Sequence, residues 1–163
     1  KVLVGYPSPT EEFVIVERMT GALQVVQKVL TTDQLLTLQK EVDTVYVDPA
    51  LIEYAVKIVA ATRQPQSVGL KELRPYLTFG ASPRASINLI LTARALAYVR
   101  GRMYALPQDV LDMAHDVIRH RLVLSYEALS DNVSADDLLD KLLGRIALPE
   151  VPLHEHVDIR ARA

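Results

Sequence analysis

Apolar residues recur at three- and four-residue intervals along most of this chain, a period typical of helices with one buried face. The stripe is clearest in one segment, where it consists of Ile52, Ala55, Val56, Val59 and Ala60. Proline or a capping residue precedes several of the periodic segments, as is usual where helices begin. The pattern predicts helices over residues 9–19, 32–40, 49–62, 83–101, 107–118 and 135–144.

Two of these helices carry specific expectations about burial. Phe13, Val14 and Val16 should form the buried side of the first helix. The helix over residues 83–101 is apolar nearly all round, which is the pattern of a helix buried on every side. We therefore expect this helix to lie at the centre of the core.

Two short apolar runs, residues 45–47 and 122–124, read as strands rather than helices. Neither is long enough to be stable alone, so we expect them to pair with each other. The predicted fold class is therefore mainly α, a helical bundle with one very small two-stranded sheet.

Composition limits the classes of function. The chain has 163 residues, 50% of them hydrophobic, which is enough for one sizeable core. Its formal net charge of −2 gives no general attraction to nucleic acid or to an anionic membrane. Cysteine is absent, which excludes disulfides, thiolate catalysis and thiolate metal ligands. No apolar run is long enough to span a membrane, so a cytoplasmic location is the default expectation.

The organisation of the chain suggests a piece of a longer protein. Residues 1–7 resemble the end of a strand followed by a hinge, and residues 8–148 carry the helical pattern. Residues 149–163 show no period and are expected to be a tail. His154 and His156 lie in that tail, where solvated side chains are favoured over a metal site.

Several kinds of chemistry have no motif here. The sequence contains no Gly-x-x-x-x-Gly-Lys-Ser/Thr loop and no apolar strand ending in Asp-Glu, so the chain alone is not expected to be an enzyme. Basic residues are dense only at 100–102 and 119–121. A nucleic-acid surface would also need surplus positive charge and interleaved aromatic residues, so a solvated or partner-facing edge is preferred.

The start of the helix over 83–101 is the strongest candidate for a site. Ser82 suits the N-cap, Pro83 suits the first helical position, and Arg84 follows in the first turn. The free N–H groups there are already partly positive, so an added guanidinium favours an anion, with phosphate the best match. The alternative is an ordinary capped helix in which Arg84 is solvated. Local chemistry alone favours this alternative.

A family resemblance changes this balance. Residues 78–85, Thr-Phe-Gly-Ala-Ser-Pro-Arg-Ala, follow Val-Gly-Tyr-Pro-Ser-Pro-Thr-Glu-Glu at 4–12 and precede Val-Ser-Ala-Asp-Asp at 133–137. With Val-Tyr-Val-Asp at 45–48 and Arg-His-Arg-Leu-Val-Leu-Ser at 119–125, this order resembles the MoxR family of AAA+ ATPases over residues 4 to about 143. The matching part of that family is its C-terminal helical lid, and the family's P-loop core has no counterpart here.

The resemblance implies specific roles. Arg84 looks like the sensor 2 arginine, which reaches toward the γ-phosphate of ATP held by the core domain. Pro83 would lie beside the nucleotide, and Tyr6 and Pro7 would form a hinge wall near the base. Asn88 is one helical turn after Arg84 and is expected from spacing to orient its guanidinium.

The resemblance also implies partners and ligands. ATP and Mg would be used by the full-length protein, and neither is expected to bind this piece alone. Expected partners are the AAA+ core of the same chain, neighbouring subunits of a hexamer, and a protein containing a von Willebrand A domain; no nucleic acid and no membrane are expected. A helical interaction module without nucleotide binding, or a nucleic-acid-binding helical domain, are the alternatives.

Overall fold

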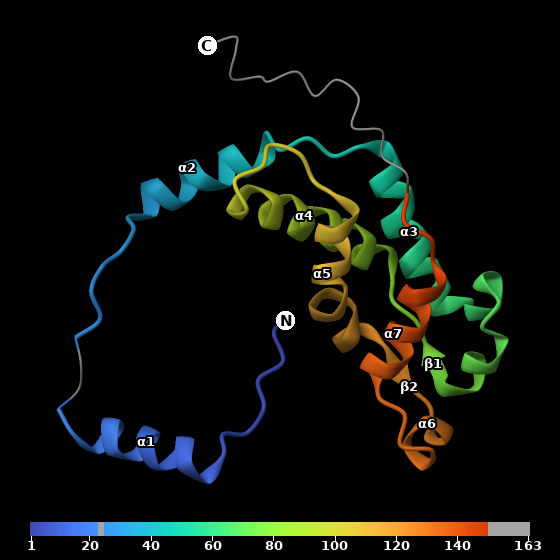
Figure 1. Ribbon diagram of the computed structural model, residues 1–163, viewed down its shortest axis with the longest axis horizontal. Helices are drawn as coiled ribbons and strands as arrows, with labels where there is room; N and C mark the ends of the chain where they lie inside the picture. Colours follow the sequence, from blue (N-terminus) through green and yellow to red (C-terminus); the bar gives the residue numbers. More distant parts are fainter. Residues whose placement is uncertain (23–24, 150–163) are drawn as a thin grey trace. The chain divides into compact units, whose positions relative to one another are not determined.

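The computed structural model describes residues 1–22 and 25–149 (Figure 1). The tail predicted from residue 149 lies outside the described residues from position 150 onward, and so do His154 and His156. The chain divides into two compact units, residues 1–41 and 42–163, which are described separately. No helix among the described residues is both long and apolar enough to cross a membrane.

The first unit holds helix α1, Pro9–Thr20, and most of α2, Thr32–Asp43. Ser8 and Glu11 form the capping box that starts α1. The expectation that Phe13, Val14 and Val16 are buried is wrong, because all three are exposed and α1 contains no buried residue. Residues 1–8 form neither helix nor strand, which is what a strand sequence adopts without a partner strand.

The second unit contains the remaining elements, and its helix starts follow the sequence signals. Asp48 caps α3 by accepting from the N–H of Ala50, and Ser134 caps α7 with Asp137 completing a capping box. The elements are α3 Pro49–Arg63, η1 Pro65–Val68, η2 Lys71–Tyr76, β1 Leu77–Phe79, α4 Pro83–Val99, α5 Pro107–Ile118, η3 Arg119–Arg121, β2 Val123–Leu124, α6 Tyr126–Ser130 and α7 Ala135–Arg145. The mainly α fold with a two-stranded sheet is confirmed.

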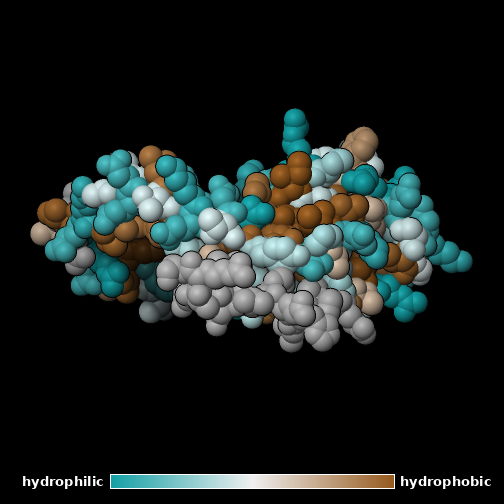
Figure 2. Space-filling model, turned by 90° about the horizontal axis from the view of Figure 1, so that it is seen from above, coloured by the Kyte–Doolittle hydropathy of each residue, from teal (hydrophilic) through white to brown (hydrophobic). Residues whose placement is uncertain are grey.

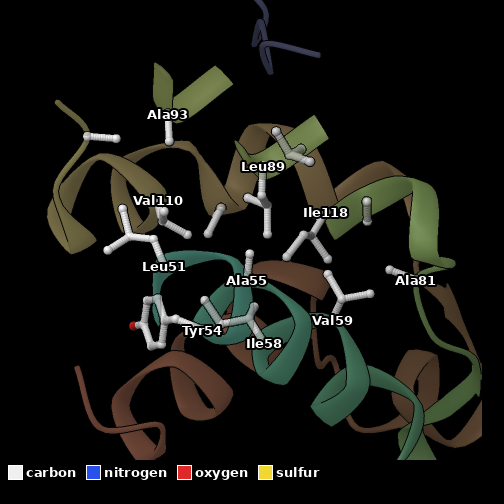
Figure 3. Packing of buried hydrophobic residues seen from close by; sticks show 14 of the residues in the cluster. Leu51, Tyr54, Ala55, Ile58, Val59, Ala81, Leu89, Ala93, Val110 and Ile118 are labelled. Atoms are coloured by element: carbon white, nitrogen blue, oxygen red, sulfur yellow. The ribbon is translucent and has the colours of Figure 1, made fainter. Parts of the chain in front are cut away.

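The core of the second unit lies where α3, α4 and α5 meet, with α7 packing on α3 and α5. Figure 3 shows Leu89 of α4, Val110 of α5 and Ala55 of α3 pointing toward one another. A second, smaller cluster joins Leu73 and Leu77 to Leu138 and Leu142 of α7. The two clusters fix both ends of α3, because its residues contribute to each of them.

Helix α4 differs from the sequence expectation. Its buried residues are Ala85, Leu89, Ala93 and Ala97, which follow one another at intervals of four. Three alanines on this face let α4 approach its neighbours closely. Ile87, Leu91 and Val99 are exposed, so the prediction of a helix buried on all sides is wrong. Apolar residues all round a helix show that every face could be buried. Here the described residues fully bury only one face of α4.

The small sheet exists, but its pairing differs from the prediction. β1 and β2 are antiparallel, with Leu77 opposite Leu124 and Phe79 opposite Val123. The run at 45–47 instead meets the loop between α4 and α5, where the Tyr46 N–H donates to the carbonyl of Met103 and Tyr46 forms an isolated bridge with Tyr104. The expected pairing of 45–47 with 122–124 is therefore wrong. Tyr46 pairs with the loop between α4 and α5, and residues 123–124 pair with β1.

Candidate functional site at the start of α4

The segment leading into α4 lies directly on the end of α3. Gly80 approaches the backbone of Thr62 and Arg63 so closely that a Cβ atom would overlap the Thr62 carbonyl group. Gly80 has an ordinary negative-φ backbone, so the missing side chain, and not conformational freedom, is what this position requires. This contact sets how near the start of α4 lies to α3.

Three hydrogen bonds fasten the same segment to α3. The buried Thr62 hydroxyl donates to the Val59 carbonyl at 2.6 Å and accepts from the Ala81 N–H at 2.9 Å. The Arg63 Nη1 donates to the Ala81 carbonyl at 2.7 Å. Both main-chain groups of Ala81 are thus held by the last turn of α3. The residue just before the N-cap of α4 is therefore fixed in position.

The first turn of α4 is open. Ser82 occupies the N-cap position with extended backbone and Pro83 follows it, as the sequence predicts. The Ser82 side chain, however, makes no capping hydrogen bond, which the choice of serine had suggested. No described side chain caps the first-turn N–H groups, although the Ala85 N–H donates to the Ser82 carbonyl at 2.8 Å, and the partial positive charge of this helix end favours an anion.

Arg84 stands at this open end. Its side chain is exposed, and no hydrogen bond or ion pair joins its guanidinium to any other described residue. Free donors of a planar guanidinium next to uncapped N–H groups form a place suited to an anion with several oxygens. The phosphate-facing interpretation of this turn stays a prediction.

The other predicted site residues have different surroundings. Pro83 lies next to Arg84 at the first helical position. Asn88 is half-buried one turn later, and no hydrogen bond joins its side chain to Arg84 among the described residues, so its orienting role stays a prediction. Tyr6 and Pro7 belong to the first unit and are exposed. Their role in a hinge wall also stays a prediction.

An apolar hollow of about 460 Å³ lies between α3 and α4, next to this turn. The sequence analysis missed it, because Ile52 and Val56 of α3 were assigned to the core stripe. Ile52 and Val56 are about half exposed, and Figure 2 shows that hydrophobic residues, in brown, lie on the surface among hydrophilic ones. The hollow is lined by Ile52, Val56, Arg63, Pro83, Ser86, Ile87, Ile90 and Leu91. Arg63 and Ser86 are the polar residues of this lining.

The two basic groups, at 100–102 and 119–121, have different surroundings from Arg84, because carboxylates lie beside each group. Asp109 has no exposed surface and accepts from Arg102 at 2.6 Å and from Arg100 at 2.8 Å, as well as from the Leu106 N–H. Burial acts to raise the pKa of Asp109, but hydrogen bonds from Arg102, the Leu106 backbone and Arg100 outweigh it, and the pKa lies below its usual value. This cluster fastens the turn between α4 and α5.

The second basic group is engaged in the same way. Arg119 donates to Asp136 at 2.9 Å and to Asp116 at 2.7 Å, and the hydrogen bond to Asp136 is the main cause of its raised pKa. His115 lies within 2.8 Å of the same Asp136 oxygen and within 3.0 Å of Asp140. These contacts join α5 to α7. Arg100, Arg102 and Arg119 are therefore all paired with carboxylates. Arg84, in contrast, has no carboxylate partner among the described residues.

Comparison with known proteins identifies the class. Residues 71–142, which run from η2 through the start of α4 to α7, match the family described as the AAA lid domain. The chain is 46% identical over 151 residues to Chaperone MoxR1 of Mycobacterium tuberculosis, covering 93% of this chain and 40% of that protein. It is 34% identical over 110 residues to Protein MoxR of Paracoccus denitrificans, covering 64% of this chain and 32% of that protein.

A solved structure agrees with these sequence matches. The crystal structure of a presumed ATPase from Cytophaga hutchinsonii superimposes with a TM-score of 0.81 at 30% identity, covering 90% of this chain and 45% of that one. Within the second unit, residues 71–142 thus match an AAA lid domain. These matches fit the lid part of the MoxR family of AAA+ proteins. It spans less than half the length of these relatives.

Proposed function

We propose that this chain is the lid of an ATP-hydrolysing MoxR-type protein, to which it contributes Arg84 as the sensor 2 arginine. The observation that carries the proposal is the unengaged Arg84 guanidinium at an uncapped helix start that is fastened to α3. A preorganised cation stabilises the negative charge that develops on a transferring phosphoryl group. Arg84 would bind the γ-phosphate of ATP and lower the barrier to hydrolysis.

The same contact would convert hydrolysis into movement. Because Ala81 and Gly80 hold the start of α4 against α3, a change at Arg84 is transmitted to a packed domain and not absorbed by a loose loop. Loss of the γ-phosphate removes the ligand that Arg84 contacts, and the lid changes its angle to the core. That motion would remodel partner proteins, in keeping with the name chaperone given to the Mycobacterium relative.

The remaining parts of the machine are proposed from the family. They are the AAA+ core of the same chain, neighbouring subunits of a hexamer, and a partner protein with a von Willebrand A domain, acting in the cytoplasm. Within the described residues no group of three or more His, Cys, Asp or Glu side chains could hold a metal ion. We expect the proposed core to hold the Mg²⁺ that accompanies ATP, and we expect ATP to bind only weakly to the lid alone.

Replacing Arg84 by Ala in the full-length protein tests the proposal. We expect ATP turnover to fall by about 10- to 1,000-fold, the scale for removing one preorganised donor from such a site. Folding should be unaffected, because the side chain is exposed and has no partner among the described residues. Turnover and thermal unfolding measured on the same preparations separate the two effects.

Arg84→Lys provides the matched control. Lysine keeps the charge but loses the planar pair of donors, so it should restore turnover only partly. Unchanged turnover in Arg84→Ala would show that Arg84 is a solvated surface residue and would reject the proposal. Loss of folding would show that Arg84 has a structural role instead.

A second candidate, an interaction module without nucleotide binding, is favoured by the apolar hollow between α3 and α4. Exposed apolar surface of this kind is typical of protein-binding sites. This candidate predicts that Arg84→Ala leaves ATP turnover intact while Ile87→Ser, in the hollow, disturbs partner binding. The turnover measurement therefore decides between the two candidates.

A further inference from the structure

The last turn of α3 supplies a second arginine to the start of α4. Arg63 ends α3, and its Nη1 donates to the Ala81 carbonyl at 2.7 Å. Ala81 is followed directly by the N-cap Ser82, which makes no capping bond of its own. The position of the first turn of α4 therefore depends on bonds from α3 and not on a local cap.

The surroundings of Arg63 support a role beyond helix stability. A basic residue in the last turn of a helix ordinarily complements the helix dipole and points to solvent. Arg63 instead crosses to another element, and it lines the hollow beside Pro83 and Ser86, the residues that flank Arg84 along the first turn of α4. Thr62, next to it, holds the N–H of the same Ala81. Two adjacent residues of α3 thus hold both main-chain groups of one residue of the loop.

We propose that Arg63 is a positioning residue for Arg84: it holds the Ala81 carbonyl and so fixes where the Arg84 guanidinium meets the phosphate. This inference rests on the proposed role of Arg84. Misplacement of a reacting or charge-stabilising group by about 1 Å can cost on the order of 100-fold in rate. Arg63 acts on the rate without touching ATP.

A double-mutant cycle in the full-length protein tests the inference. Arg63→Met removes the guanidinium and keeps an unbranched apolar chain of similar reach. We expect kcat for ATP hydrolysis to fall about 10-fold with KM changed less than threefold, because ground-state contacts to ATP made by the core domain are untouched. In the Arg84→Ala background, Arg63→Met should lower kcat less than twofold further, since there is no guanidinium left to position.

Two control variants complete the design. Arg63→Lys keeps one donor for the Ala81 carbonyl and should retain part of the lost rate. Arg121 also donates to a main-chain carbonyl, that of Val117 at 2.8 Å, but at the end of α5, so Arg121→Met should leave kcat unchanged. Thermal unfolding of each variant shows whether the domain is intact.

The outcomes separate the two proposals. A fall in kcat with Arg84→Ala but none with Arg63→Met overturns the positioning role and leaves the proposed function standing. An equal fall with Arg63→Met in both backgrounds also overturns it, because the effect then does not pass through Arg84. If Arg84→Ala itself has no effect on kcat, the proposed function is rejected, and the positioning role of Arg63, which rests on it, is rejected with it.

Discussion

Asp109 shows how a single residue organises the turn between α4 and α5. It is fully buried and accepts hydrogen bonds from Arg100, Arg102 and the Leu106 N–H. Two cations from a three-residue segment therefore converge on one carboxylate. What the sequence showed as a basic surface group is, in the folded domain, the positive half of an ion cluster around one buried carboxylate.

We expect Asp109→Asn to destabilise the domain by about 2 kcal/mol, because the amide keeps the shape but removes the buried negative charge that Arg102 and Arg100 share, and only Arg100 keeps another carboxylate among the described residues, that of Asp112. The lowered pKa of Asp109 also fixes the sign of the pH dependence. Its contribution is complete above the pKa of the unfolded chain, about 3.9, and is lost as the pH falls through the lower folded value. Urea unfolding of the two proteins between about pH 3 and 7 measures both effects.

A constant difference in unfolding free energy across that whole range would contradict this account of Asp109. Asp140→Asn is a suitable control, since Asp140 is largely exposed and, among the described residues, its carboxylate meets only His115. That variant should change stability by less than about 1 kcal/mol, as is usual for an exposed ion pair.

Asp109 also marks a limit of sequence reasoning at the scale of residues. The motif around Arg84 could be found because capping preference and helix polarity are local properties. The burial of Asp109 could not, because it depends on where α4 ends and on how the chain folds back into α5. The anchoring role of Arg63 was missed for the same reason, since it is 18 positions away from Ala81.

At the scale of elements, the joint between α3 and the loop before α4 is the feature that places the site. Gly80→Ala should destabilise the domain by roughly 1–3 kcal/mol or more, because the added methyl group meets main-chain atoms of Thr62 and Arg63 that cannot move aside independently. Chemical denaturation of the variant measures this cost. The strain should also lower ATP turnover in the full-length protein, since it displaces the start of α4.

Gly144→Ala is the matched control for Gly80. Gly144 lies in α7 with open space where a Cβ would be, so alanine there should be neutral or stabilise by up to about 1 kcal/mol. Equal stability of the Gly80 and Gly144 variants would contradict the close approach of the loop to α3.

The elements differ in how well they could be predicted. The helices begin at or next to the residues that the caps and prolines indicate, because those signals act within one turn. β1 was not predicted, since Leu77–Phe79 becomes a strand only by pairing with β2 far along the chain. The burial of α4 was overestimated, because periodicity shows which residues are apolar but not which face other elements cover.

At the scale of the whole molecule, the chain corresponds to one part of longer relatives. It spans 40% of the Mycobacterium relative and 45% of the Cytophaga structure. The exposed apolar residues of α1 and of the hollow between α3 and α4 are surfaces that the described residues leave uncovered. In the proposed function, Arg84 would form one side of a nucleotide site, and the proposed core would hold the nucleotide.

The central claim is that Arg84 recognises the γ-phosphate, and nucleotide discrimination tests it most directly. Calorimetric titration of the full-length protein and of Arg84→Ala with ADP and with a non-hydrolysable ATP analogue gives four affinities. The account predicts that Arg84→Ala weakens binding of the ATP analogue about 10-fold or more, the scale of a charge-assisted hydrogen bond, and changes ADP binding less than twofold. Equal weakening for both nucleotides, or none for either, would contradict it.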